Sequence, residues 1–145
     1  MHDQVFHDYL QLSRLLVNKL NEQLTENEFY HSQWLVLNYL KNYGASTLVD
    51  ISDYLHVEKS AITRTVNRLE QNQLIMQIPS KDKRQRKMQL TEKGEEKFAL
   101  GSKTVVEIES QALHGISQEE QKHFFETLSK IKHNLNNGGS SVEKQ

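Results

Sequence analysis

The chain has 145 residues, of which 36% are hydrophobic and 26% charged. This composition excludes an intrinsically disordered chain, and no apolar run approaches the roughly 20 residues that a membrane span needs. The absence of cysteine excludes disulfides, thiolate nucleophiles and cysteine-ligated zinc sites. The first residues show no signal-peptide pattern, and the absence of cysteine favours a reduced, cytoplasmic setting. The length suits one domain, or one domain plus an oligomerisation extension.

Positive charge is concentrated in one segment of the sequence. Residues 56–91 contain eight basic and three acidic side chains, a net charge of +5, so the other 109 residues carry −6 within a total of −1. Such a segment indicates a surface for a polyanion such as DNA. The alternative interpretation is an ordinary solvated charged face.

Residues 5–24 are expected to form a helix, because apolar side chains recur at intervals of three and four residues. The apolar stripe is wide and consists of Val5, Phe6, Tyr9, Leu10, Leu12, Leu16, Val17, Leu20 and Leu24. Its width predicts either burial in the chain's own core or contact with a second subunit. Helical spacing resumes at Trp34 and ends at Gly44, a residue that favours helix termination.

Two further helices are expected over residues 47–55 and 58–72. Thr47 can cap the first of these, because Asp50 follows at the spacing of a capping box. The second has an inward face of Ile62, Val66 and Leu69. Its opposite face carries Ser60, Thr63, Arg64, Asn67 and Arg68. A short helix, a tight turn and a longer helix with a polar, basic face form a helix-turn-helix pattern.

Two short strands are predicted after these helices, over residues 74–78 and 87–90. The loop between them, residues 80–86, is polar and basic. Such a hairpin directly after a helix-turn-helix forms a wing. Two helices then complete the chain, and Ser117 with Glu120 makes a capping box at the start of the last one.

Three stretches carry a family resemblance: residues 47–55, residues 57–70, and a wing in which Asp82 and Arg84 precede Leu90-Thr91 at the spacing D-x-R-x-x-x-x-x-L-T. Over about residues 5–135 the chain resembles the MarR family of bacterial winged helix-turn-helix regulators. The resemblance implies a mainly α fold with a small β-hairpin wing, in which residues 1–135 form one domain. Residues 5–24 and 93–135 would form a helical dimerisation region and residues 30–91 the DNA-binding lobe. Residues 136–145 have nothing to bury and are expected to form a disordered tail.

The resemblance also implies a homodimer that binds a pseudo-palindromic operator in double-stranded DNA as a repressor, with a small-molecule effector as one means of relieving repression. The residues expected to contact DNA are Thr47, Lys59, Ser60, Thr63, Arg64, Asn67, Arg68, Lys81, Asp82, Arg84 and Arg86. In the major groove, Arg64 and Arg68 can donate two hydrogen bonds to guanine, and Asn67 can pair with adenine.

At the wing, the resemblance implies that Arg84 enters the minor groove, where a narrow A·T-rich stretch concentrates negative potential. Asp82 is expected to hold the Arg84 guanidinium by a charge-assisted hydrogen bond; the alternative is a simple turn residue. Basic side chains are expected to add attraction to the DNA backbone: Lys81, Lys83, Arg86 and Lys87.

The sequence departs from the family pattern in three places. By the resemblance, residues 57–70 form the recognition helix, and Gln73 replaces the usual glycine after it. Asn72 or Gln73 must therefore reverse the chain without glycine's freedom. Gln77 occupies a position at which the family often has an arginine. Tyr30 replaces the usual hydroxyl cap of the second helix, which predicts a less sharply defined helix start.

Other classes of function have less support. The seven histidines form no H-x-x-x-H pair, and no catalytic motif is present, so neither a metal site, a cofactor nor an enzyme is expected. Tyr9, Trp34 and Tyr39 can line an effector pocket or pack in the core. The alternatives left open are a winged-helix module that binds protein and a small helical protein that sequesters a metal or ligand.

Overall fold

The computed structural model describes residues 2–82 and 84–138. In chain order its elements are α1 (His2–Leu24), the 3-10 helix η1 (Thr25–Asn27), α2 (His31–Tyr43), β1 (Ser46–Thr47), α3 (Leu48–Leu55), α4 (Lys59–Gln71), β2 (Ile75–Ile78), β3 (Lys87–Leu90), α5 (Glu92–Ala112) and α6 (Gln118–Asn136). The prediction of a mainly α fold with a small β wing is confirmed. The chain divides into two compact units, residues 1–109 and 110–145.

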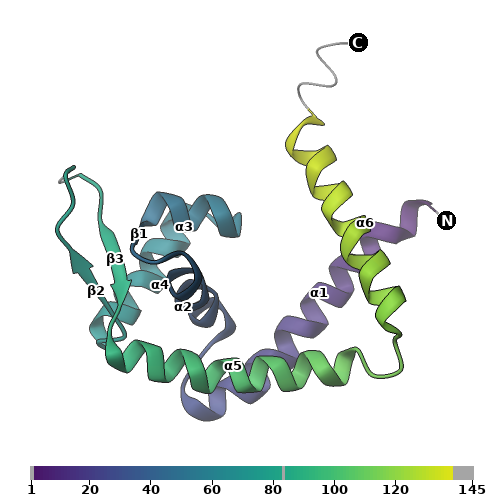
Figure 1. Cartoon of the computed structure of the whole chain (residues 1–145), viewed down its shortest axis with the longest axis horizontal. Coiled ribbons are helices and arrows are strands. Elements are labelled where there is room, and N and C mark those ends of the chain that lie inside the picture. The colour runs from purple at the N-terminus through teal and green to yellow at the C-terminus, as the bar shows by residue number, and fades with distance from the viewer. Residues whose placement is uncertain (1, 83, 139–145) are drawn as a thin grey trace. The chain divides into compact units, whose positions relative to one another are not determined.

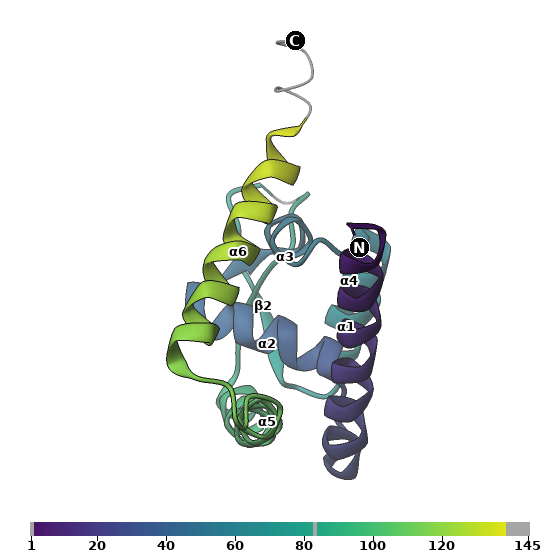
Figure 2. The same ribbon diagram turned by 90° about the vertical axis from the view of Figure 1, so that its right-hand side faces the viewer.

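The core of the first unit lies where α1, α2, α3, α4 and the sheet meet. Each element contributes apolar side chains that are almost fully buried, among them Leu24, Leu37, Ile51, Val66 and Met88. Figure 2, in which α5 is seen end-on, shows α2 lying across this unit with one end beside α1. The helix-turn-helix is therefore held on a packed scaffold.

The sheet has three strands where the sequence predicted two. β2 and β3 pair antiparallel from Ile75 opposite Leu90 to Ile78 opposite Lys87. β1 adds Ser46 opposite Met88 on the other side of β3. A two-residue strand is too short to show alternation, so the sequence does not predict it. In Figure 1 the hairpin of β2 and β3 lies beside α3 and α4, where a wing is expected.

The start of α2 is closed without a hydroxyl cap from Tyr30. The backbone N–H of Tyr30 donates to Gln33 Oε1 over 2.9 Å, and the N–H of His31 donates to Asn21 Oδ1 of α1 over 2.8 Å. Two amide oxygens thus satisfy N–H groups that a helix start leaves free. The prediction that α2 starts less sharply is wrong, because the side-chain oxygens of Gln33 and Asn21 supply the acceptors that Tyr30 lacks.

The chain reversal after α4 takes place at Gln73. This residue has φ = 63°, in the left-handed region, and the N–H of Leu74 donates to the carbonyl of Leu69 over 2.9 Å. That six-residue closure is a Schellman motif, which usually has glycine at the left-handed position. Gln73 is therefore the residue that reverses the chain, one of the two positions that the sequence singled out.

Thr91 of the wing motif connects the segment that follows α4 to the start of α5. Its hydroxyl donates to the carbonyl of Gln73 over 2.6 Å and accepts from the N–H of Gly94 over 3.0 Å. Gly94 is buried, and a Cβ there would collide with the carbonyl oxygen of Leu74. Gly94 therefore allows a close backbone approach between the start of α5 and Leu74.

Gly94→Ala should lower the free energy of unfolding by about 2 kcal/mol or more, because a backbone carbonyl cannot move aside. Gly101→Ala should cost less, since its Cβ would meet the Trp34 and Phe29 rings at 2.8 and 2.9 Å and rings can turn. Ala99→Gly, at an exposed site of α5, measures the intrinsic preference of a helix for alanine over glycine, about 1 kcal/mol. Urea unfolding measures all three, and an equal cost at Gly94 and Gly101 would contradict the close approach.

Apolar side chains remain exposed on α1 of the first unit and on α6 of the second. On α1, six of them have 45–59% of their surface exposed: Val5, Phe6, Tyr9, Leu10, Leu12 and Leu15. On α6, Phe124, Phe125 and Leu135 are 53–75% exposed. Within residues 2–82 and 84–138, no helix combines the length and apolar character needed to cross a membrane.

Candidate nucleic-acid interface

The helix-turn-helix begins at a fully formed cap. The Thr47 hydroxyl accepts from the N–H of Asp50 over 3.1 Å, and the Asp50 carboxylate accepts from the N–H of Thr47 over 3.5 Å. α3 then buries Leu48 and Ile51 in the core. His56, at φ = 55°, ends α3 in the left-handed conformation and starts the turn into α4. The predicted capping box is therefore confirmed.

α4 presents its polar face outward as the periodicity predicts. Ile62, Val66 and Leu69 are almost fully buried. The residues that the sequence assigned to DNA lie on the opposite side: Lys59, Ser60, Arg64, Asn67 and Arg68 are exposed, and Thr63 is half-buried. The Thr63 hydroxyl donates to the carbonyl of Lys59 over 2.9 Å, which leaves its oxygen lone pairs as acceptors.

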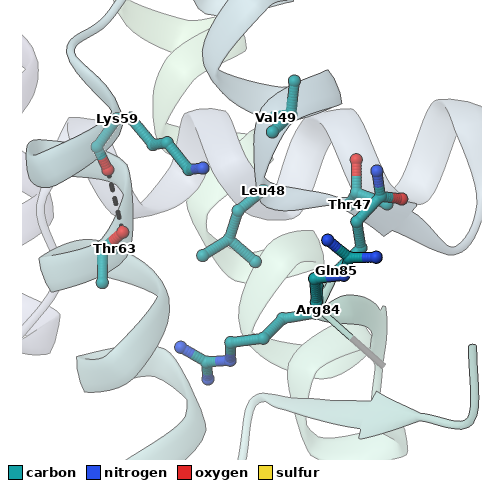
Figure 3. Close-up of a pocket in the computed structure, with 8 residues that line it drawn as sticks. Thr47, Leu48, Val49, Lys59, Thr63, Arg84 and Gln85 are labelled. Atoms are coloured by element: carbon teal, nitrogen blue, oxygen red, sulfur yellow. Dashed lines mark hydrogen bonds between the residues drawn. The ribbon is translucent and has the colours of Figure 1, made fainter. Parts of the chain in front are cut away.

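A cleft of about 200 Å³ lies between the start of α3, the start of α4 and the wing. Figure 3 shows Thr47, Leu48 and Val49 along one side, Lys59 and Thr63 on α4, and the wing residues Arg84 and Gln85. Leu48, Val49 and Gln85 were not singled out in the sequence, because nothing local marks them as neighbours of the recognition helix. The cleft brings together five of the expected contact residues: Thr47, Lys59, Thr63, Arg84 and Arg86.

Arg84 is a highly accessible charge of the wing, with 95% of its side chain exposed. Asp82 Oδ1 accepts from the backbone N–H of Arg84 over 3.0 Å, whereas the guanidinium Nε lies 3.8 Å away. The expected charge-assisted hydrogen bond from the Arg84 guanidinium to Asp82 is not formed, but the two side chains lie within ion-pair distance, and the carboxylate accepts from the backbone N–H. Asp82 shapes the turn, and the exposed Arg84 guanidinium keeps hydrogen-bond donors for a partner. Lys81 is exposed, and Lys83 lies outside the described residues.

Arg86 is not an unattached charge of the loop. Its guanidinium donates from Nη2 to Glu70 Oε1 over 2.9 Å and from Nη1 to Asn67 Oδ1 over 2.8 Å. About a third of each ion-pair side chain is exposed, 31% for Arg86 and 39% for Glu70. Glu70 was not a candidate in the sequence, and its separation of 16 residues from Arg86 explains why. Lys87 is half-buried at the start of β3.

The aromatic residues considered for an effector pocket divide into two groups. Trp34 and Tyr39 pack against the core, which was the alternative to lining an effector pocket. The Trp34 Nε1–H donates to Ser102 Oγ over 3.1 Å. His31 stacks on Trp34 with ring centroids 5.9 Å apart, and burial lowers the pKa of His31. Tyr9 is exposed on α1.

Comparison with known proteins places this geometry in a family. The MarR family profile matches residues 29–85, which include the helix-turn-helix and most of the wing. The HTH-type transcriptional regulator YwoH of Bacillus subtilis (strain 168) is 34% identical over 120 residues, which cover 83% of this chain and 88% of YwoH.

Solved structures agree on the fold. A MarR family transcriptional regulator from Listeria monocytogenes, solved with a 26mer DNA, is 23% identical with a TM-score of 0.84 and covers 97% of this chain and 95% of its own. BpsR of Bordetella bronchiseptica, whose DNA binding is regulated by 6-hydroxynicotinic acid, is 20% identical with a TM-score of 0.81 and covers 89% of this chain and 98% of its own. The chain belongs to the MarR family of winged helix-turn-helix transcriptional regulators.

Proposed function

We propose that this chain is a sequence-specific repressor that binds double-stranded DNA through α4 and the wing. The observation that carries the proposal is the cleft at which the polar, basic face of α4 meets the wing of the exposed Arg84. A B-DNA major groove admits one α-helix, and a narrow minor groove attracts an arginine. Because such a regulator acts on the chromosome, we place its activity in the cytoplasm.

The proposed active form is a homodimer on a pseudo-palindrome. Residues 5–24 and 93–135 would supply the dimer contacts, and their exposed apolar side chains on α1 and α6 support this role. Residues 30–91 would supply the DNA-binding lobe of each subunit. Two equivalent lobes read two half-sites about one helical turn apart, roughly 34–36 Å.

We also propose that a small molecule relieves repression. BpsR, whose DNA binding responds to 6-hydroxynicotinic acid, supports this mode of control. The chain contains no cysteine, so a switch based on its own thiols is excluded. A ligand that prefers the conformation unable to bind DNA by a hundredfold contributes about 2.7 kcal/mol, sufficient to empty a moderately occupied operator.

Asp82→Ala should weaken operator binding about three- to tenfold although it removes a negative charge, because the turn that presents Arg84 loses its acceptor. Asp82→Asn is the matched control: its amide oxygen can still accept from the Arg84 N–H, so binding should stay near that of the natural chain or become tighter. Fluorescence anisotropy with a labelled duplex measures both variants. Tighter binding by Asp82→Ala would show that Asp82 only repels phosphate.

Titration of mixed-sequence duplex DNA at about 50 mM salt tests the function itself. Lys59, Arg64, Arg68 and Arg84 should give binding that saturates at micromolar protein, as expected for non-specific association at low salt. Arg64→Ala should relax base preference at one position by about 1–3 kcal/mol. Failure to bind any duplex would instead favour the alternative of a winged-helix module that binds protein.

A further inference from the structure

Arg86 bridges the wing and the recognition helix through a forked contact. One guanidinium nitrogen donates to Asn67 Oδ1 over 2.8 Å, and another donates to Glu70 Oε1 over 2.9 Å. Asn67 and Glu70 are three residues apart on α4, so they lie on one side of that helix. The planar guanidinium, with parallel donors, suits this pair of acceptors.

This contact fixes the orientation of the Asn67 amide. A guanidinium carries only donors, so the group of Asn67 that faces Arg86 must be the carbonyl oxygen. Asn67 is exposed on the face of α4 assigned to DNA, and without such a partner its amide can turn over freely. Its Nδ2 amino group is then the part of the side chain that remains unengaged by the contact with Arg86.

The orientation has a consequence for the base that Asn67 reads. Pairing with adenine requires the asparagine oxygen to accept from adenine N6 while its amino group donates to N7. In this structure the oxygen already accepts from a cation, whose positive charge disfavours a second donor beside it. Guanine presents two adjacent acceptors, N7 and O6, to an amino group in the major groove.

We propose that Arg86 is a positioning residue that turns the Asn67 amide oxygen toward the wing, so that Asn67 offers its amino group to the bases and selects guanine instead of adenine. This inference rests on the proposed function, since it concerns how the DNA-binding face chooses its site. It replaces the adenine pairing that the sequence alone suggested for Asn67. A contact that only fastened the wing would change affinity without changing the preferred base.

Selection of bound duplexes from a random pool separates these outcomes. The position read by Asn67 is the one whose preference disappears in Asn67→Ala. At that position the natural chain should enrich guanine over adenine. Arg86→Met, which keeps an unbranched apolar stem and removes the guanidinium donors, should shift the guanine-to-adenine ratio toward adenine by on the order of tenfold. In the Asn67→Ala background, Arg86→Met should leave that position unchanged.

Two further variants complete the test. Glu70→Gln retains an oxygen that can accept from Arg86, so it should alter affinity but not the preferred base. Asn67→Asp keeps the partner of Arg86 and loses the amino group, so the guanine preference should vanish even if Arg86→Met does not fold. Adenine at the Asn67 position in the natural chain, or an unchanged preference in a folded Arg86→Met, would overturn the inference. Absence of binding to every duplex would overturn the proposed function instead.

Discussion

Leu12→Glu should convert a dimer into monomers at micromolar concentration. Leu12 is 53% exposed among the apolar residues of α1, and in a two-fold dimer the substitution occurs twice. Lost burial of about 1.5–3 kcal/mol at each copy predicts at least a hundredfold weaker association, before the cost of burying two carboxylates. Light scattering should report twice the 16.9 kDa chain mass for the natural protein and one chain mass for the variant.

Met76→Glu is the matched control for this substitution. Met76 is 46% exposed but lies in β2 of the wing, away from the proposed dimer contacts. The control should therefore keep the mass of a dimer. A natural chain that is monomeric at micromolar concentration would contradict the homodimer, and with it the two equivalent lobes on a pseudo-palindrome.

Operator affinity should fall about 10⁴-fold between 50 and 200 mM salt. If each subunit neutralises about four phosphates, the logarithm of the binding constant falls with the logarithm of salt concentration at a slope near −7. Arg84→Ala removes one cation per subunit and should reduce the slope by about 2. Fluorescence anisotropy titrations at several salt concentrations measure this slope for the natural chain and the variant.

Lys103→Ala is the control for the salt dependence. Lys103 is an exposed cation on α5, outside the α4 face and the wing, so its removal should leave the slope unchanged. An Arg84→Ala slope equal to that of the natural chain would mean that the wing arginine does not approach phosphate. A flat response of the natural chain would contradict a polyanion as the partner.

The sequence predicted those parts of the fold that depend on local repetition. The three-to-four-residue spacing of Ile62, Val66 and Leu69 oriented the recognition helix correctly, because a helix must bury its apolar stripe. The capping box of Thr47 and Asp50 was equally visible, since both of its hydrogen bonds lie within three residues. The charge excess of residues 56–91 indicated the exposed polar face.

The contacts that refine the site could not be predicted, because they join residues distant in the chain. In the sequence Arg86 is one of several loop cations, and only the fold brings it to Asn67 and Glu70. Asp82 was assigned to the Arg84 side chain, although the adjacent backbone N–H is the nearer donor. The role of Gly94 was not predicted, since nothing local reveals the approach of the Leu74 carbonyl.

Selection of bound duplexes by the natural chain tests the central claim most directly. Sequence-specific binding by two equivalent winged lobes predicts enrichment of a pseudo-palindrome whose half-sites are about one helical turn apart, roughly 34–36 Å, with A·T-rich flanks where Arg84 would enter the minor groove. A pool that remains random after repeated rounds, or a single asymmetric motif bound by a monomer, would contradict the account.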